Sequence, residues 1–257
     1  MIELIHLTKK FGNFTAVDDI NIVIPKGEFF AVLGPNAAGK TTTIKMMTGM
    51  IKPTAGTAKI AGYDIQLQPI EARKSMAYVP DFPFLYDKLT VWEFIKFTGE
   101  IFNMDESEIV KNATELIDLF NLREFINNAI ESLSHGTRQR VVLVSALLHN
   151  PEVFIIDEPM VGLDPHHAKT LKDILKERSK NGMTVFFSTH QIEIAEELAD
   201  RIGIINKGRL IAVGTPDELR QQSKIEGSLE SVFIALTKNN LNQNNNQIPA
   251  AQTFDNV

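Results

Sequence analysis

An eight-residue segment of the chain could bind phosphate, because it fits the pattern G-x-x-x-x-G-K-[ST]. Its members are Gly34, Pro35, Asn36, Ala37, Ala38, Gly39, Lys40 and Thr41. In such a loop, backbone N–H groups converge at the start of a helix and cradle phosphate oxygens. We expect Lys40 to reach the β and γ phosphates, the Thr41 hydroxyl to bind Mg²⁺, and Thr42 to join them at the helix start. The pattern predicts a nucleoside triphosphate site and leaves the base open.

A pair of carboxylates follows a second apolar segment. Residues 153–156 are apolar and run directly into Asp157 and Glu158. Side chains at the carboxyl end of a buried parallel strand lie where open α/β sheets bind their ligands. Asp157 is therefore a candidate Mg²⁺ ligand, and Glu158 a candidate base that polarises a water for attack on the γ phosphate. Taken alone, the pair fits a solvated turn after a strand as well as it fits a catalytic site. The phosphate-binding segment elsewhere in the chain favours the catalytic site.

These residues require a buried sheet to position them. Residues 29–33, 153–156 and 184–187 are continuous apolar runs, typical of parallel strands covered on both faces. Residues 2–7 and 20–24 alternate instead and predict a half-exposed antiparallel sheet. Helical spacing over 91–102, 106–120 and 137–148 predicts a helical subdomain at about 86–148. The fold class is therefore α/β, with an antiparallel β-subdomain and a helical subdomain.

The composition limits which functions the chain can have. Its 257 residues carry a net charge of -6, which gives no general attraction to nucleic acid. No apolar run approaches the roughly 18 residues of a membrane-spanning helix, and the chain has no cysteine. We expect a cytoplasmic protein without a transmembrane segment. We also expect one domain over residues 1–236, followed by a disordered Asn/Gln-rich tail at 237–257.

One more segment connects these motifs to a known family. The string Leu133-Ser134-His135-Gly136-Thr137-Arg138-Gln139-Arg140 resembles the signature motif L-S-G-G-Q of the ATP-binding subunits of ABC transporters, followed by Q-R. The resemblance covers about residues 1–236 and implies a P-loop NTPase core. Here His135 replaces a glycine and Thr137 replaces the glutamine, while Ser134 and Gly136 still offer a hydroxyl and backbone N–H groups to a γ phosphate.

Three further positions match the same family. Asp164, in Gly162-Leu163-Asp164, resembles the D-loop that follows the carboxylate pair. His190 resembles the switch histidine that senses the γ phosphate, and Phe11 the aromatic residue that stacks on adenine. Two nearby histidines, His166 and His167, have no third ligand at helical spacing, so we interpret them as surface residues rather than a metal site.

The resemblance implies an assembly as well as a reaction. In this family the signature faces away from its own phosphate loop, so a complete site combines Lys40 of one subunit with Ser134 of a second. The implied function is ATP hydrolysis, with Mg²⁺, that powers a transporter. The implied partner is a transmembrane permease on another chain, contacted near residues 82–92 at the cytoplasmic face of the membrane. The segments at 229–237 and 87–93 favour the exporter-type members.

Two positions depart from the family pattern. Ala37 stands where many members have glycine, at a cost of roughly 1–2 kcal/mol if its φ is positive. Asp81 stands where the family usually has a glutamine that binds Mg²⁺ through a neutral carbonyl, so this candidate metal ligand brings a negative charge.

Three alternative functions make their own demands on the sequence. A soluble ABC-type ATPase acting on ribosomes or DNA predicts tandem nucleotide domains or a coiled-coil insert, and the sequence has one phosphate loop and no heptad run. A GTPase needs N-K-x-D, and the nearest string is Asn206-Lys207-Gly208-Arg209. A nucleotide-binding regulatory module with slow turnover stays open, because Asp81 could leave binding intact and hydrolysis slow.

Overall fold

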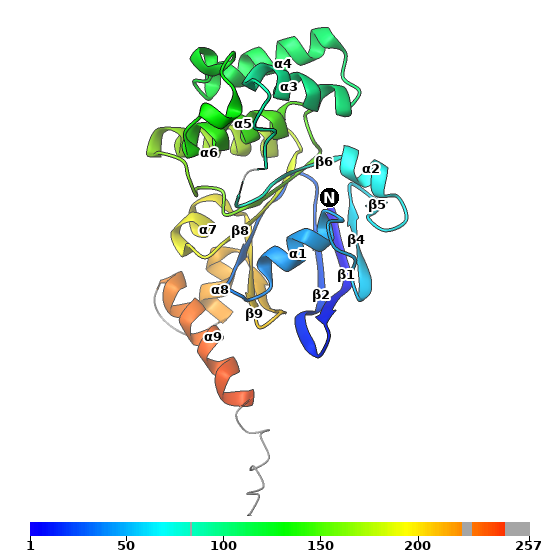
Figure 1. The fold of residues 1–257 in the computed structure, drawn as a ribbon. Coiled ribbons are helices and arrows are strands. Elements are labelled where there is room, and N and C mark those ends of the chain that lie inside the picture. Colours follow the sequence, from blue (N-terminus) through cyan, green and yellow to red (C-terminus); the bar gives the residue numbers. More distant parts are fainter. Residues whose placement is uncertain (83, 223–227, 245–257) are drawn as a thin grey trace, which may run out of the picture.

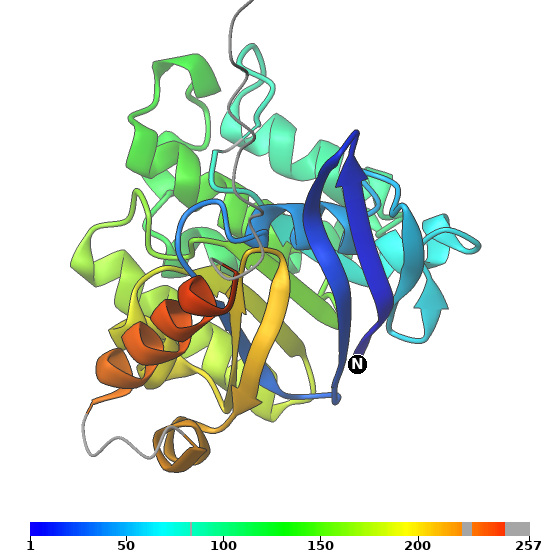
Figure 2. The same cartoon turned by 90° about the horizontal axis from the view of Figure 1, so that it is seen from below.

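The computed structural model describes residues 1–82, 84–222 and 228–244 and contains two β-sheets with helices around them (Figure 1). The smaller sheet is antiparallel, as its alternating sequence predicts. Its strands, in spatial order, are β2 (Phe14–Ile24), β1 (Ile2–Phe11), β4 (Ala55–Ile60) and β5 (Tyr63–Asp64). In the view from below, the blue strands β1 and β2 lie side by side next to the cyan segment that contains β4 and β5 (Figure 2).

The larger sheet has six strands and carries the residues of interest. In spatial order they are β10 (Arg209–Gly214), β9 (Arg201–Asn206), β3 (Phe29–Leu33), β8 (Thr184–Thr189), β7 (Val153–Asp157) and β6 (Met76–Val79). All neighbours are parallel except β9 and β10. Strands β3, β7 and β8 are buried along their whole length, as their continuous apolar runs predict.

Two hydrophobic cores cover the faces of this sheet. Successive residues of β3 alternate between them: Phe29 and Ala31 belong to one core, and Phe30 and Val32 to the other. Helix α1 (Lys40–Met47) packs with the four-stranded sheet in the second core. Helices α6 (Pro165–Lys180) and α7 (Ile192–Leu198) contribute to the first. Short helix α8 (Pro216–Gln222) adds Leu219 to the first core, and short helix α2 (Pro69–Lys74) adds Ala72 to the second.

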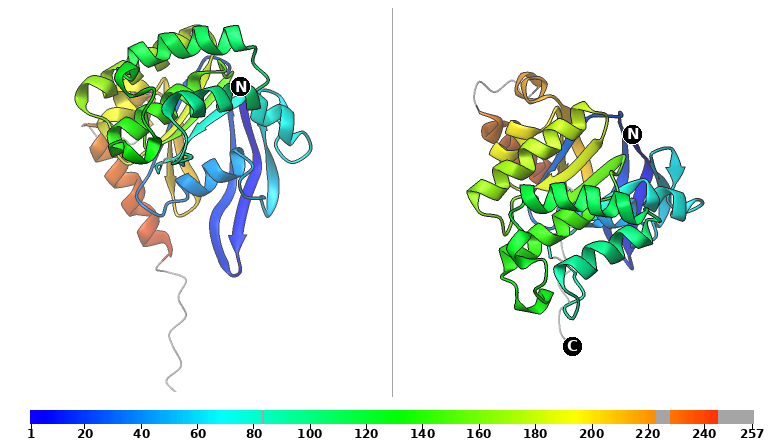
Figure 3. Two further views of the ribbon diagram at one scale, coloured as in Figure 1. Left: turned by 45° about the horizontal axis from the view of Figure 1, so that its top comes forward. Right: turned by 90° about the horizontal axis from the view of Figure 1, so that it is seen from above.

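The predicted helical subdomain is present and forms one group of helices, green in Figures 1 and 3. It contains α3 (Val91–Ile101), α4 (Glu106–Leu119), η1 (Arg123–Phe125), η2 (Ile130–Ser132) and α5 (His135–Leu147). Thr90 and Glu93 form a capping box at the start of α3, which explains why that helix begins where it does. Helix α5 starts at His135, two residues earlier than its spacing predicts, because Ser134 caps it.

The end of the chain differs from the sequence-based expectation. Helix α9 (Leu229–Asn244) packs against α7 and α8 and continues through 237–244, which we expected to belong to the disordered tail. Once the packed turns near Val232 exist, adding residues to an existing helix costs far less than starting one. The Asn206 side chain also donates to the Thr237 carbonyl, at 3.2 Å. The rest of the predicted tail, 245–257, lies outside the described residues.

The order of strands positions the chemistry. Strands β3, β8, β7 and β6 are parallel neighbours, so their carboxyl ends meet at one edge of the sheet. Gly34 follows β3 and His190 follows β8. Asp157 ends β7, Glu158 comes directly after it, and Asp81 lies two residues after β6. Four segments that are far apart in sequence therefore reach the same place.

Candidate functional site

The phosphate-binding segment forms a tight loop between β3 and α1. Gly34 has no room for a side chain, because a Cβ there would lie 2.5 Å from the Ile205 carbonyl oxygen. Gly39 adopts φ 107, a left-handed conformation that favours glycine. Ala37 has φ 62, so the position considered in the sequence analysis does require a positive φ. The loop therefore holds backbone strain at an alanine beside the start of α1.

Lys40 lies inside this loop. Its ammonium nitrogen donates to the Gly34 carbonyl at 2.7 Å and to the Pro35 carbonyl at 3.2 Å, and the residue is buried. Burial lowers the pKa of Lys40, and the nearby carboxylates of Glu158 and Asp157 partly oppose that shift. Within the described residues, two of the three ammonium donors bind these carbonyls, which leaves one donor for a phosphate oxygen.

Thr41 and Asp157 meet directly. The Thr41 hydroxyl donates to Asp157 Oδ2 at 2.8 Å, and the Ser188 hydroxyl donates to Oδ1 of the same buried carboxylate. A hydroxyl and one carboxylate suit Mg²⁺, which prefers oxygen ligands and usually completes its shell with phosphate oxygens and water. Within the described residues, no cluster of three His, Cys, Asp or Glu side chains could hold a metal alone. The donor set therefore fits a metal shared with a nucleotide.

Glu158 and His190 form the second pair at this edge. His190 Nδ1 lies 2.8 Å from Glu158 Oε1, and the Thr189 hydroxyl donates to Oε2 at 3.2 Å. The Glu158 side chain is largely buried and His190 is half exposed. Glu158 also has a positive φ of 54, an unusual backbone conformation that is typical of functional sites. A carboxylate held in this way can accept a proton from a bound water.

A cavity of about 330 Å³ lies beside the loop. Its lining includes the predicted loop residues from Asn36 to Thr42, together with Asp81, Asp157 and Glu158. Phe14 also lines it, whereas Phe11 does not. Both phenylalanines are exposed, and Lys9 Nζ lies over the Phe11 ring at 5.0 Å from its centroid. Our sequence reasoning missed Phe14, although Phe11-Gly12-Asn13-Phe14 places two aromatic residues at the same turn.

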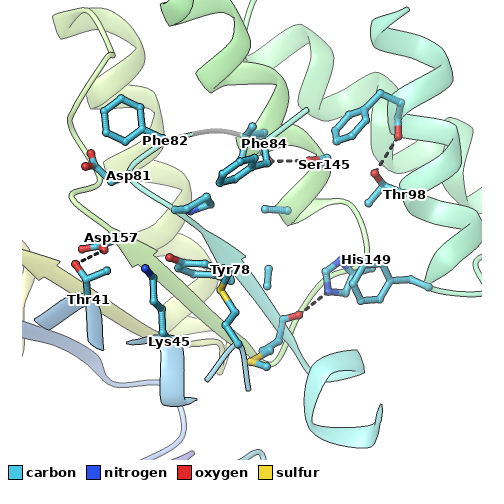
Figure 4. Close-up of a pocket in the computed structure, with 18 residues that line it drawn as sticks. Thr41, Lys45, Tyr78, Asp81, Phe82, Phe84, Thr98, Ser145, His149 and Asp157 are labelled. Carbon is cyan, nitrogen blue, oxygen red and sulfur yellow. Dashed lines mark hydrogen bonds between the residues drawn. The ribbon is translucent and has the colours of Figure 1, made fainter. Parts of the chain in front are cut away.

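A larger groove of about 880 Å³ continues from the carboxylate end of the site (Figure 4). Thr41, Asp81 and Asp157 line it at that end, and Phe82, Phe84, Phe94 and Phe102 make it aromatic elsewhere. Asp81 therefore lies on the lining of both cavities. Of the expected contact region 82–92, Phe82 and Phe84 line the groove, while Trp92 packs against the core.

Two titratable side chains in the groove have strongly shifted pKa values. Burial raises the pKa of Tyr78 to about 12, and the charges of Asp157 and Asp81 add to that shift. Burial lowers the pKa of His149 to about 4, although its Nε2 lies 3.2 Å from the Met76 carbonyl oxygen. The His149 ring stacks on Phe102, with centroids 3.6 Å apart. The groove therefore keeps both groups neutral near pH 7.

The signature-like segment lies apart from the phosphate-loop cavity, whose lining includes neither Ser134 nor Gly136. Ser134 caps α5 and accepts from the Thr137 N–H at 3.2 Å. Gly136 packs against the segment before α6, since a Cβ there would lie 3.0 Å from the Gly162 carbonyl oxygen. The structure thus joins Lys40, Thr41, Asp157, Glu158 and His190 and leaves Ser134 and Gly136 elsewhere on the chain.

Asp164 caps α6 and binds its own neighbours. It accepts from the backbone N–H groups of His166 and His167 at 3.0 Å, and its Oδ2 lies 2.6 Å from His167 Nδ1. The backbone and side-chain hydrogen bonds from His167 lower the pKa of Asp164 to about 2. Our interpretation of both histidines as surface residues is wrong for His167. Its ring is buried because it lies between the Asp164 carboxylate and the Arg140 guanidinium.

Comparisons with known proteins agree with this geometry. Residues 17–161 match the family model described as ABC transporter. The linearmycin resistance ATP-binding protein LnrL of Bacillus subtilis (strain 168) is 36% identical over 243 residues, covering 95% of this chain and 76% of that protein. The Nod factor export ATP-binding protein I of Ralstonia nicotianae (strain ATCC BAA-1114 / GMI1000) is 36% identical over 83% of this chain and 66% of that protein.

Solved structures give the same result. The ATP-binding subunit of an ABC transporter has a TM-score of 0.89 and 32% identity, covering 92% of this chain and 99% of that one. A dimeric cassette, MJ0796, bound to ADP and Pi in a post-hydrolysis state, has a TM-score of 0.73 and 29% identity, covering 84% and 98%.

The fold and the site define a P-loop nucleotide hydrolase, with the phosphate loop after β3 and the carboxylate pair at the end of β7. The chain belongs to the ABC transporter family, as the signature-like segment indicated. It is an ATP-binding, ATP-hydrolysing subunit that powers a transporter. Within the part of the chain that the structure describes, no helix is both long and apolar enough to span a membrane.

Proposed function

We propose that this chain drives export across a membrane by hydrolysing ATP at the edge formed by β3, β8, β7 and β6. The observation that carries the proposal is the contact of Glu158 with His190 beside the contact of Thr41 with Asp157. These two pairs supply a proton acceptor and a metal ligand set within one cavity lining. The name of a relative that serves Nod factor export supports the direction of transport.

Each residue has a separate part in the proposed reaction. The loop N–H groups from Asn36 to Thr42 and the Lys40 ammonium bind the phosphates. Glu158 accepts a proton from water as the water oxygen bonds to the γ phosphorus and the bond to the β–γ bridging oxygen breaks. The products are ADP and phosphate. His190 orients Glu158 and responds to the γ phosphate, and Thr41 and Asp157 would hold Mg²⁺, which neutralises the developing charge.

A second nucleotide-binding subunit is part of this proposal. Ser134 and Gly136 offer a hydroxyl and backbone N–H groups at the start of α5, away from the phosphate loop of their own chain. A second copy, or a related subunit, could bring its signature to this loop while receiving the same contact in return. The related MJ0796 cassette is dimeric, which supports this pairing.

The second proposed partner is a membrane permease subunit on another chain. The aromatic groove lined by Phe82 and Phe84 offers an apolar surface that continues to Asp81 and Asp157. A permease segment seated there would lie against the residues that bind the nucleotide and the metal. This contact would hold the chain at the cytoplasmic face of the membrane. The net charge of -6 supports a protein partner rather than nucleic acid.

Glu158→Gln tests the proposal. The amide keeps the shape of the side chain and loses its capacity as a base, so ATP binding should persist and multiple-turnover phosphate release should fall by about 100-fold or more. With ATP and Mg²⁺, the variant should run as a dimer in gel filtration. Glu152→Gln, at the exposed opposite end of β7, is the matched control and should keep wild-type turnover. Wild-type turnover in Glu158→Gln, or a monomer at saturating ATP, would contradict the proposal.

A further inference from the structure

A continuous set of polar contacts connects the D-loop to the signature segment inside one chain. It begins at Asp164, whose Oδ2 lies 2.6 Å from His167 Nδ1. The other ring nitrogen, His167 Nε2, lies 3.2 Å from Arg140 Nη1. His167 and Arg140 come from α6 and α5, so the contacts cross between the two helices.

The chemistry of Arg140 decides which nitrogen of His167 carries the proton. A guanidinium can only donate hydrogen bonds, so His167 Nε2 must accept. A neutral imidazole that accepts through Nε2 carries its proton on Nδ1, and that proton points at the Asp164 carboxylate. The pair of contacts therefore selects one neutral tautomer of a buried histidine.

Arg140 also contacts the signature segment. Its Nη2 donates to Thr137 Oγ1 at 3.0 Å, and Thr137 Oγ1 lies 2.9 Å from Ser134 Oγ. Arg140 Nη1 also donates to the Phe120 carbonyl at 2.8 Å, which anchors the guanidinium. Thr137 stands where the family motif has glutamine, so the hydroxyl contact between Thr137 and Ser134 is a property of this sequence.

The direction of the hydroxyl protons follows. Thr137 Oγ1 accepts from a cation, which polarises its own O–H and favours donation of that proton to Ser134 Oγ. Ser134 then has its single proton available for an external acceptor. An anionic phosphate oxygen is the acceptor that such a hydroxyl at a helix start would bind best.

We propose that His167 is a positioning residue that couples Asp164 to the orientation of the Ser134 hydroxyl through Arg140 and Thr137. This inference rests on the proposed function, because it takes the nucleotide of a second subunit as the acceptor. A displacement of Asp164 withdraws the partner of His167 Nδ1 and frees the ring to turn. Arg140 Nη1 then loses its nitrogen acceptor and keeps the carbonyls of Phe120 and Asn121, at 2.8 and 3.1 Å, so the guanidinium shifts toward these carbonyls and away from Thr137. The signature therefore loses its phosphate-directed proton when the D-loop moves.

A double-mutant cycle tests the coupling. In the Glu158→Gln background, the dissociation constant of the ATP-bound dimer is measured by sedimentation for Ser134→Ala, His167→Leu and the combined variant. Ser134→Ala and His167→Leu should each weaken the dimer about 100-fold, because one hydrogen bond to a charged partner contributes about tenfold and the dimer contains the contact twice. The combined variant should be no weaker than Ser134→Ala, because His167 acts through Ser134.

Two further variants separate positioning from packing. His167→Gln can still accept from Arg140 and should keep the dimer within about threefold of the parent. Lys169→Met is the matched control, because Lys169 is exposed on the same helix and its replacement should leave dimerisation unchanged. Nitrogen NMR of the His167 ring should detect the proton on Nδ1. If His167→Leu does not fold, His167→Asn replaces it in the cycle.

The outcomes are distinguishable. Two results refute the proposed pairing of subunits: a Glu158→Gln protein that stays monomeric with ATP, or a Ser134→Ala variant that dimerises normally. Either result also refutes the relay, by which we mean the proposed coupling of Asp164 to Ser134 through His167. If Ser134→Ala weakens the dimer but His167→Leu has no effect, the relay is refuted and the proposed function stands. The same holds if the effects of Ser134→Ala and His167→Leu on the dimer dissociation constant are additive. A proton on Nε2 also overturns the relay.

Discussion

Ala37→Gly should stabilise the protein. Ala37 has φ 62, and its methyl group is exposed in the phosphate loop, so it makes no buried contact that glycine would lose. A left-handed φ costs an ordinary residue roughly 1–2 kcal/mol, and glycine avoids this cost. Glycine also loses about 0.4–1 kcal/mol through the greater freedom of the unfolded chain. The difference is a net gain of about 0.5–1 kcal/mol in the free energy of unfolding.

The neighbouring alanine provides the control. Ala38 is buried and lies outside the set of described residues with positive φ. Ala38→Gly loses about 0.8 kcal/mol for the buried methyl group and about 0.4–1 kcal/mol of unfolded-state entropy. That variant should therefore be less stable by about 1–2 kcal/mol. Two identical substitutions at adjacent positions should change stability in opposite directions.

Thermal and urea unfolding without nucleotide measure both variants. A gain of about 0.5–1 kcal/mol corresponds to a rise in midpoint of roughly 1–4 °C for a chain of this size. A loss of stability in Ala37→Gly comparable to that in Ala38→Gly would refute the argument from backbone strain.

Three more predictions follow from the site. Phe11→Ala should weaken ATP binding about tenfold through lost base stacking and leave tripolyphosphate binding unchanged. If only Phe14→Ala weakens ATP binding by this amount, the stacking residue is Phe14, which lines the cavity. Asp81→Gln should change the Mg²⁺ concentration needed for half-maximal hydrolysis. It should also keep or tighten metal-free nucleotide binding, because a repulsive charge is removed. If the Mg²⁺ dependence and the nucleotide affinity both equal those of the parent, Asp81 does not belong to the site. The pKa of His149 is about 4 in the fold and 6.5 when unfolded, so the unfolded chain binds the proton first as the pH is lowered. Stability should therefore fall by about 3 kcal/mol as the pH is lowered from 6.5 to about 4. His149→Gln should remove most of that fall in urea titrations.

The local elements followed from the sequence. Continuous apolar runs at β3, β7 and β8 predicted strands buried on both faces, and those strands are buried throughout. The phosphate loop was equally local, because its glycines and Lys40 act within eight residues. The comparison with a motif that has glycine at position 37 raised a positive φ there as a condition, and the structure shows that Ala37 does have one.

Contacts between distant segments required the tertiary structure. The burial of His167 was missed because nothing near it in sequence shows that Arg140, on another helix, lies against its ring. Phe14 was missed for a related reason, since a hairpin decides which of two nearby aromatic residues lines a cavity. The extent of α9 depended on its packing against α7 and α8, which composition does not reveal.

The sequence alone therefore determined the phosphate loop, the carboxylate pair and the division into a sheet core and a helical subdomain. Those features depend on residue type and on period, which are properties of short segments. Only the tertiary structure decided that Glu158 meets His190, that Thr41 meets Asp157, and that the aromatic groove continues to the same edge. The physical reason is that strand order in a parallel sheet sets which segment ends are neighbours, and no local pattern encodes that order.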